Sequence, residues 1–130
     1  SNFWPGRMDD FKVYNYARTA SQVVEDMNAG HPAPGSPVGS PLGYWKLDEG
    51  YGTTANNSGN GGSAINGTLT NMASPGTSIS GWTNSGKFGR ALIFDGTDDV
   101  VTVTNVAAID FDLGLVNHTF SGWIYAESDV

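Results

Sequence analysis

The sequence predicts an all-β fold, and three observations support this prediction. Charged residues make up only 15% of the chain, and 18 of its 130 residues are glycine. Its apolar runs are short and alternate with polar residues, which is typical of strands that bury one face. Stretches rich in Gly, Asn and Ser separate these runs and mark turns. We expect an antiparallel jelly-roll-type β-sandwich, incomplete in this chain, with one short helix near the N-terminus.

The N-terminal part of the chain predicts a strand and then a helix. Residues 7–14 alternate between apolar and polar side chains, which indicates a strand. Thr19 and Gln22 have the spacing of a capping box, so we expect a helix over about residues 20–28. Gly30 suits the position just beyond its C-terminus. One face of this helix would carry an apolar stripe of Val23, Val24 and Met27.

A proline-rich segment follows the predicted helix. Residues 31–42 hold four of the chain's six prolines, namely Pro32, Pro34, Pro37 and Pro41. Proline lacks a backbone donor, so it interrupts helices and central strands alike. We therefore predict a semi-extended linker over residues 30–42.

The C-terminal part predicts a series of short strands between turns. Trp45 and Leu47 share one face of the strand expected over residues 43–48. A hairpin is expected where Gly-Thr-Asp at 96–98 joins two apolar runs. The other expected elements are a loop at 49–66, a strand at 67–72, a turn-rich stretch at 73–86, the two hairpin strands at 91–96 and 99–105, and a strand at 118–126.

Composition and charge exclude several classes of function. The net charge is −7, and the six Lys and Arg residues are scattered singly. Without a basic stripe, nucleic acid is not an expected partner. The chain has no cysteine, which excludes disulfides and thiol nucleophiles. No apolar run approaches the roughly 20 residues of a membrane span, so no membrane span is expected.

Four motifs give the chain a resemblance to a known family. The first three, in order, are YWKLDEGYGTTANNSG at 44–59, GKFGRALIFDGTDDVV at 86–101 and TFSGWIY at 119–125. The fourth is MDDFKVYNYARTASQV at 8–23, which precedes the others. Together they resemble laminin G-like repeats of the concanavalin A-like lectin/glucanase superfamily.

The resemblance has consequences for organisation and function. In that family the motif found here at 8–23 closes the sandwich, whereas in this chain it comes first. The chain therefore resembles the tail of one repeat, residues 1–29, joined by the linker to the head of the next, residues 43–130. This implies a non-catalytic module of a tandem array, extracellular or on the cell surface. Such a module would serve adhesion and bind carbohydrate or protein, with adjacent repeats or neighbouring copies as further partners.

The resemblance also implies one structural calcium ion where the first and last strands meet. The residues carried over to it are Asp10 with Asp48 or Asn57. From the sequence alone, the acidic pairs at 9–10 and 98–99 are the sharpest candidates, because calcium takes several oxygen ligands. The same carboxylates would also be expected at strand ends, where they cap turns and face water.

No pattern in the sequence indicates catalysis. Glycosidases need two carboxyl groups across a cleft. Asp48 and Glu49 are adjacent, so on a strand they would point to opposite faces. His31 falls in the predicted linker and His118 at the start of a strand, and both are expected on the surface. We therefore expect a chain that is not an enzyme.

Aromatic and glycosylation sites complete the candidate residues. Trp45 and Trp123 fall in predicted strands, where we expect them to pack in the sandwich. Tyr51 and Trp82 fall in predicted loops and are the candidates for ligand binding. The N-glycosylation pattern occurs at Asn56, Asn66 and Asn117.

Two further arrangements stay open from the sequence. The first is a structural subunit of an extracellular filament, in which the strand at residues 7–16 is donated to a neighbouring copy. A heterologous contact of that kind does not close and produces a fibre. The second is a fragment or domain-swapped chain in which the same strand folds back onto its own C-terminal part.

Overall fold

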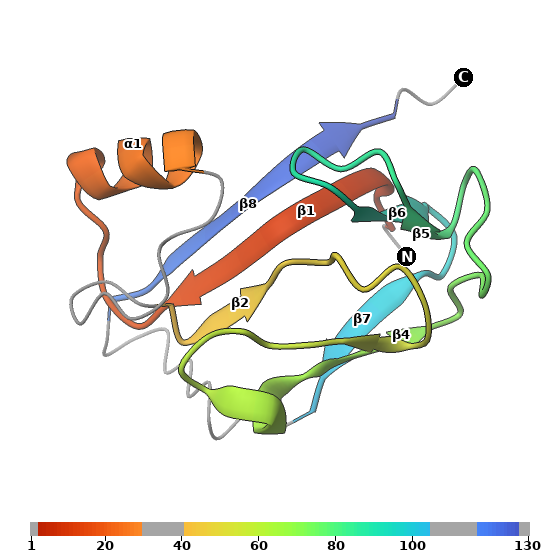
Figure 1. The fold of residues 1–130 in the computed structure, drawn as a ribbon, viewed down its shortest axis with the longest axis horizontal. Coiled ribbons are helices and arrows are strands. Elements are labelled where there is room, and N and C mark those ends of the chain that lie inside the picture. Colours follow the sequence, from red (N-terminus) through yellow and green to blue (C-terminus); the bar gives the residue numbers. More distant parts are fainter. Residues whose placement is uncertain (1–2, 30–40, 105–116, 128–130) are drawn as a thin grey trace.

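A computed structural model describes residues 3–29, 41–104 and 117–127. The all-β prediction is confirmed, because the described strands form antiparallel sheets that curl as a half-barrel (Figure 1). The regular helical elements among the described residues are α1 (Ala20–Ala29) and a 3₁₀ turn (Gly62–Ile65). The finer jelly-roll assignment stays a prediction.

The described strands form two sheets. The three-stranded sheet has the order β3-β4-β7, with β3 (Thr54–Ala55), β4 (Gly67–Thr70) and β7 (Val100–Val103). The five-stranded sheet consists of β1 (Pro5–Tyr14), β2 (Gly43–Trp45), β5 (Gly81–Thr83), β6 (Ala91–Asp95) and β8 (Thr119–Ala126). In this larger sheet β8 follows one edge of β1, while β2 and β6 share the other edge and β5 follows β6 (Figure 1).

The N-terminal strand therefore lies at the centre of a sheet formed by the rest of its own chain. Phe11 pairs with Trp45 of β2, and Met8 pairs with Leu92 of β6. On the opposite edge Met8 pairs with Ile124 of β8. This is the fold-back arrangement, seen within a single chain. The division into a tail, a linker and a head of successive repeats stays a prediction.

A β-bulge interrupts the pairing of β1 with β8. The register shifts between Asp9 and Lys12, and Asp10 has a φ of 51°. A non-glycine residue in this left-handed region is uncommon, although Asp tolerates it better than most. Bulges of this kind bend a strand and redirect its side chains.

The hydrophobic core lies between the two sheets. Trp45 is 5% exposed, and its indole N–H donates to the Ile65 carbonyl oxygen at 3.1 Å. Burying a large apolar side chain contributes about 1.5–3 kcal/mol. The expectation that Trp45 packs in the sandwich is confirmed. The buried cluster comprises Val13, Trp45, Leu47, Ala55, Ile65, Leu69, Trp82 and Leu92.

The predicted hairpin at 91–105 is wrong. Its two strands exist as β6 and β7, but β6 pairs with β1 and β5, whereas β7 pairs with β4 of the other sheet. The connection is therefore a corner between the sheets. Both strands are rich in apolar residues, so each can pack on the core from its own side, and periodicity alone does not tell a corner from a hairpin.

The predicted helix is confirmed, with a difference in its exposed face. The Thr19 hydroxyl accepts from the Gln22 N–H at 3.3 Å, and the Gln22 side chain accepts from the Thr19 N–H at 2.9 Å. This is the capping box. The expected apolar stripe is 43–55% exposed at Val23, Val24 and Met27. The helix instead turns Asp26 toward β1. Gly30 and linker residues 30–40 lie outside the described residues.

Within the described ranges, no helix combines the length and the apolar character that crossing a membrane requires.

Candidate functional site

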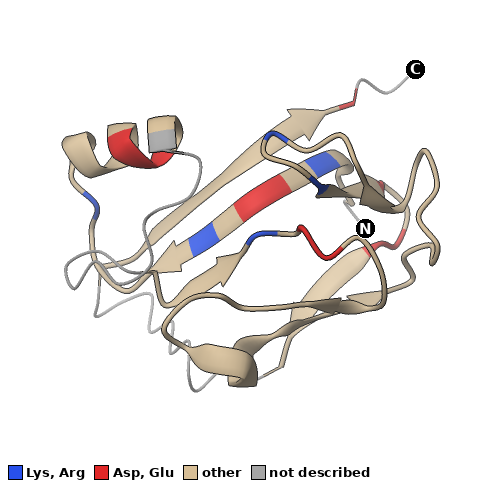
Figure 2. Ribbon diagram, viewed as in Figure 1, with Lys and Arg blue, Asp and Glu red and all other residues tan. Residues whose placement is uncertain are grey.

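Charged residues follow one another along β1, in the middle of the larger sheet (Figure 2). Cross-strand neighbours in a sheet share a face. Met8 packs against the core, so Arg7 and Asp9 face away from it. Their partners on β8 are Tyr125 and Trp123. These four side chains therefore share the outer face of the sheet.

A groove of about 330 Å³ opens on this outer face. We call it the outer groove. A loop at 84–90 borders it. A Cβ at Gly86 would collide with the Arg90 carbonyl and lie 2.9 Å from the Asp9 carboxylate. Glycine at this position therefore lets the loop approach β1 closely. The groove is lined by Arg7, Asp9, Ser85, Gly86, Lys87, Ala91, Trp123, Ile124 and Tyr125.

Asp9 is the most unusual residue of the outer groove. It is only 3% exposed. Its Oδ2 accepts from the backbone N–H of Phe88 at 2.8 Å, whereas its Oδ1 is buried without a hydrogen-bond partner among the described residues. Burial raises the pKa of Asp9, the backbone N–H groups of Phe88 and Asp10 oppose that shift, and the charges of Asp10 and Asp48 add to it. A buried carboxylate oxygen that lacks a donor is costly.

Two aromatic rings and two cations stand beside this carboxylate. The guanidinium carbon of Arg7 lies 4.1 Å from the centroid of the Tyr125 ring. The ammonium of Lys87 lies 4.7 Å from the Trp123 ring, and Phe88 meets Trp123 edge-on at 6.1 Å. Cations held over aromatic faces fix the orientation of both partners.

The outer groove thus combines an unsatisfied acceptor, cationic donors and aromatic faces. Sites for small polar ligands are concave and pair apolar rings with a few directed polar groups. A sugar ring offers both an apolar face and hydroxyl groups. The sequence does not reveal this site, because Trp123 falls in a predicted strand, where a ring packed in the sandwich is expected. The ring is on the expected strand but on the outer face, and the alternating pattern of β8 does not reveal which face is buried.

The residues of the expected calcium site take part in separate hydrogen bonds. Asp10 Oδ1 accepts from the Tyr44 hydroxyl at 2.7 Å, and Asn57 Oδ1 accepts from the Tyr44 backbone N–H at 2.7 Å. Asp48 Oδ1 accepts from the Arg90 N–H at 2.9 Å. Asp10 and Asn57 thus bind opposite ends of one tyrosine. These contacts favour a structural network, and a calcium ion on the three residues stays a prediction.

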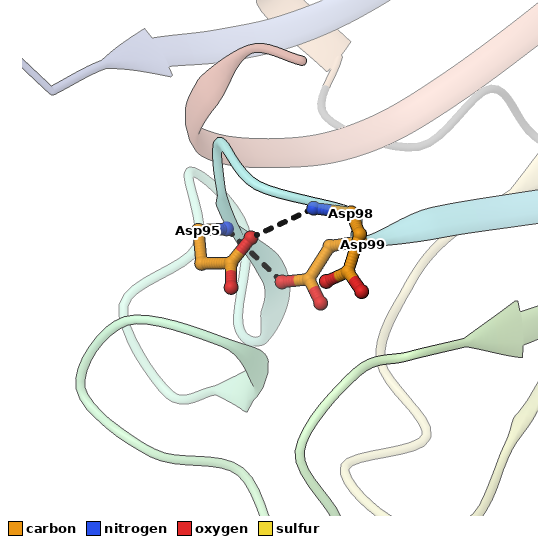
Figure 3. Close-up of side chains that lie close together, drawn as sticks. All are labelled: Asp95, Asp98 and Asp99. Carbon is orange, nitrogen blue, oxygen red and sulfur yellow. Dashed lines mark hydrogen bonds between the residues drawn. The ribbon is translucent and has the colours of Figure 1, made fainter. Parts of the chain in front are cut away.

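Three other carboxylates meet at the corner between β6 and β7. Asp95 ends β6, and Asp98 and Asp99 precede β7. One oxygen from each lies within 4.8 Å of the others (Figure 3). Among the described residues this is the one group of three or more His, Cys, Asp or Glu side chains with such a spacing. The sequence pointed to the pair at 98–99, and the fold adds Asp95.

The two predicted ligand-binding aromatics differ in accessibility. Tyr51 is 80% exposed and borders a hollow of about 130 Å³. Trp82 was expected in a loop, which is wrong: it belongs to β5 and is 7% exposed. Its indole N–H donates to the Gly52 carbonyl at 2.8 Å. Most of the Trp82 ring is therefore covered by the core, and a ligand role for either residue stays a prediction.

The predicted glycosylation sites and the described histidine differ in solvent exposure. Asn56 and Asn117 are exposed. Asn66 is half-buried, and its side-chain oxygen accepts from the Asn57 N–H at 2.8 Å. His118 is half-buried in the segment before β8, whereas His31 lies outside the described residues.

The adjacent acidic pair considered for catalysis has separate structural roles. Asp48 binds the Arg90 backbone, whereas the Glu49 carboxylate accepts from the Asn56 N–H at 2.6 Å. Each carboxylate thus fixes a different loop.

Comparison of the chain with protein-family models, with curated proteins and with solved structures gives no match. The laminin G-like resemblance therefore rests on the four sequence motifs alone.

Proposed function

We propose that this chain is a non-catalytic extracellular recognition module that binds carbohydrate in the outer groove. The observation that carries the proposal is the buried Oδ1 of Asp9, which has no hydrogen-bond partner in the part of the chain that the structure describes and lies beside the rings of Trp123 and Tyr125. The extracellular location comes from the resemblance to laminin G-like repeats.

The chemistry of the outer groove supports a ligand rich in hydroxyl groups. Asp9 lines the groove, and a ligand hydroxyl that reached its Oδ1 would donate to it and so remove the cost of the unsatisfied acceptor. The same ligand can accept hydrogen bonds from Arg7 and Lys87, because a hydroxyl both donates and accepts. An aromatic side chain provides an apolar surface for the carbon face of a sugar ring.

The proposal is tested by a glycan array followed by titration calorimetry with the best binder. Replacing Trp123 by Ala removes a ring, and Asp9→Asn removes the charge of the acceptor. We expect each change to weaken binding by about tenfold or more, since each contact contributes about 1.4 kcal/mol or more. Circular dichroism verifies that both variants remain folded.

Tyr51→Ala is the matched control, because it removes an aromatic ring outside the outer groove. We expect its affinity to stay within about twofold of the unmodified chain. If Tyr51→Ala abolishes binding while Trp123→Ala and Asp9→Asn have no effect, the outer groove is not the site. An array without any binder would contradict carbohydrate recognition altogether.

A second candidate is the structural subunit of an extracellular filament assembled by strand donation. One observation favours it. β8 pairs with β1 along one edge, and no described strand pairs with its other edge. Phe120 and Ile124 of this strand are 53% and 67% exposed. A strand edge that lacks a partner is a template for another strand, and β1 is the one described strand that pairs with β8. The acceptor would then be β8, because β1 already has partners on both edges within its own chain.

A further inference from the structure

We propose that Asp95, Asp98 and Asp99 form a calcium site at the corner between the two sheets. This inference goes beyond carbohydrate binding, because the corner carboxylates are not part of the outer groove. It also differs from the calcium position implied by the family resemblance, which uses other residues.

Local turn structure explains only part of this cluster. Asp95 Oδ1 accepts from the Thr97 N–H at 2.7 Å and from the Asp98 N–H at 3.4 Å, which caps the turn. Asp99 Oδ2 accepts from the Asp95 N–H at 3.0 Å. Capping thus accounts for Asp95 and for one oxygen of Asp99.

The second oxygen of Asp99 is the independent observation that points to a ligand. Asp99 is 5% exposed, and its Oδ1 is buried without a hydrogen-bond partner among the described residues. One carboxylate oxygen of Asp98 and one of Asp99 lie within 4.8 Å of each other, and Figure 3 shows the two carboxylates side by side. Two anionic groups facing each other repel, and burial strengthens the repulsion. A cation between them would satisfy the buried oxygen and cancel that repulsion.

The donor set selects a hard divalent cation. All three side chains offer oxygen and none offers nitrogen or sulfur, which suits calcium better than zinc or copper. None of the ion pairs found in the described part of the chain involves these three residues. The solvent exposure of Asp98 leaves room for water to complete the six to eight ligands that calcium takes.

The position of the site suggests what the ion would do. Asp95 ends a strand of the five-stranded sheet, and Asp99 immediately precedes β7 of the three-stranded sheet. An ion held by both would fix the corner at which the chain passes from one sheet to the other. Calcium would therefore stabilise the packing of the two sheets.

The test is titration of the EGTA-treated protein with calcium chloride, by calorimetry and by thermal unfolding. We expect a dissociation constant of about 0.1–1 mM, the range of extracellular calcium modules. Saturating calcium should raise the melting temperature by several degrees. Asp98→Asn and Asp99→Asn should each weaken binding by about tenfold or more. Asp98 is exposed, so its substitution leaves the fold intact.

Asp48→Asn is the matched control, because it makes the same chemical change at the position implied by the family resemblance. We expect it to bind calcium like the unmodified chain. The proposal is overturned if about 10 mM calcium, well above the expected dissociation constant, gives neither heat nor a change in melting temperature. It is also overturned if Asp98→Asn and Asp99→Asn bind normally while Asp48→Asn does not.

Discussion

Asp9 is the residue on which the proposed carbohydrate site depends, and its buried charge opposes the stability of the fold. Its carboxylate is nearly inaccessible to water, and one oxygen has no donor among the described residues. Burial raises its pKa in the folded state, so the charged form is disfavoured there. Binding residues often have such environments, because the ligand supplies what the protein leaves unsatisfied.

The raised pKa of Asp9 predicts a pH dependence of stability. Folding raises the pKa above its unfolded value of about 3.9, so the folded state binds more protons between the two values. Stability should therefore rise as the pH falls through the folded pKa toward about 3.9, by at most about 1.4 kcal/mol per pH unit for one proton. Urea unfolding of the unmodified chain and of Asp9→Asn, at several pH values, measures the difference.

Asn at position 9 has no titratable group, so the comparison isolates this one carboxyl. We expect the stability of the unmodified chain, relative to Asp9→Asn, to increase as the pH is lowered from 7 toward about 4. A difference that does not change with pH, or that changes in the opposite direction, would show that Asp9 is not destabilised by its charge.

At the scale of elements, α1 is attached to the sheet by polar contacts. The Tyr14 hydroxyl on β1 donates to Asp26 Oδ2 at 3.0 Å. Arg18 forms an ion pair with Asp26 Oδ1 at 2.6 Å and lies 4.3 Å from the Tyr14 ring. Burial and the hydrogen bond to Asp26 raise the pKa of Tyr14, so the phenol stays protonated and remains a donor. The apolar residues of the helix contribute less, because they are half-exposed.

Removing the carboxylate should therefore loosen the helix from β1. Asp26→Ala removes the acceptor of the Tyr14 hydroxyl and the carboxylate paired with Arg18, which we expect to lower the free energy of unfolding by about 3 kcal/mol. Glu25→Ala is the control, since Glu25 is exposed on the same helix and its loss should cost about 0.5 kcal/mol or less. Equal effects of the two substitutions in urea unfolding would mean that the buried contacts do not hold the helix.

Elements with strong local signals could be predicted, and elements defined by distant contacts could not. The strand expected at 7–14, the helix at 20–28 and the strand at 118–126 are found with small changes at their ends. Alternation and capping reside in neighbouring residues, so the sequence displays them. β5 has only three residues and is a strand because it pairs with β6. Because turn-forming residues flank β5, the sequence predicts a turn-rich stretch there and not a strand.

The candidate sites were predictable to a smaller extent for the same reason. The acidic pair at 98–99 was visible, but Asp95 joins it only because the chain turns a corner there. The outer groove needs Asp9 and Trp123, which are 114 residues apart in sequence and are register partners in the sheet. No local pattern brings these two side chains together.

At the scale of the whole molecule, β1 in its central position joins the other strands of the larger sheet and forms part of the outer groove. It has partners on both edges within its own chain, and it supplies Arg7 and Asp9 to the outer groove. If the strand at residues 7–16 were donated to a neighbouring copy, β1 would instead occupy the sheet of that copy, whereas addition of a strand to the edge of β8 would leave β1 in its own chain. In both the fold-back and the exchanged arrangement, β1 makes the same contacts with its neighbouring strands. These contacts lie within one chain in the first arrangement and between two chains in the second.

Disulfide cross-linking between β1 and β8 tests most directly whether β1 lies in the sheet of its own chain. The chain has no cysteine, and Met8 and Ile124 are register partners. Facing residues on antiparallel strands have Cα atoms about 4.5–5.5 Å apart, which suits a disulfide. The chain carrying both Met8→Cys and Ile124→Cys is refolded and oxidised. In parallel, the two single variants are mixed in denaturant, refolded together and oxidised.

We expect the double variant to give an internally cross-linked monomer on a non-reducing gel. The mixture of single variants should give no specific cross-linked dimer, because each β1 pairs with the β8 of its own chain. A cross-linked dimer from the mixture, together with dimers and longer species from the double variant, would contradict the account. It would show that β1 is exchanged between copies and that strand donation assembles the protein.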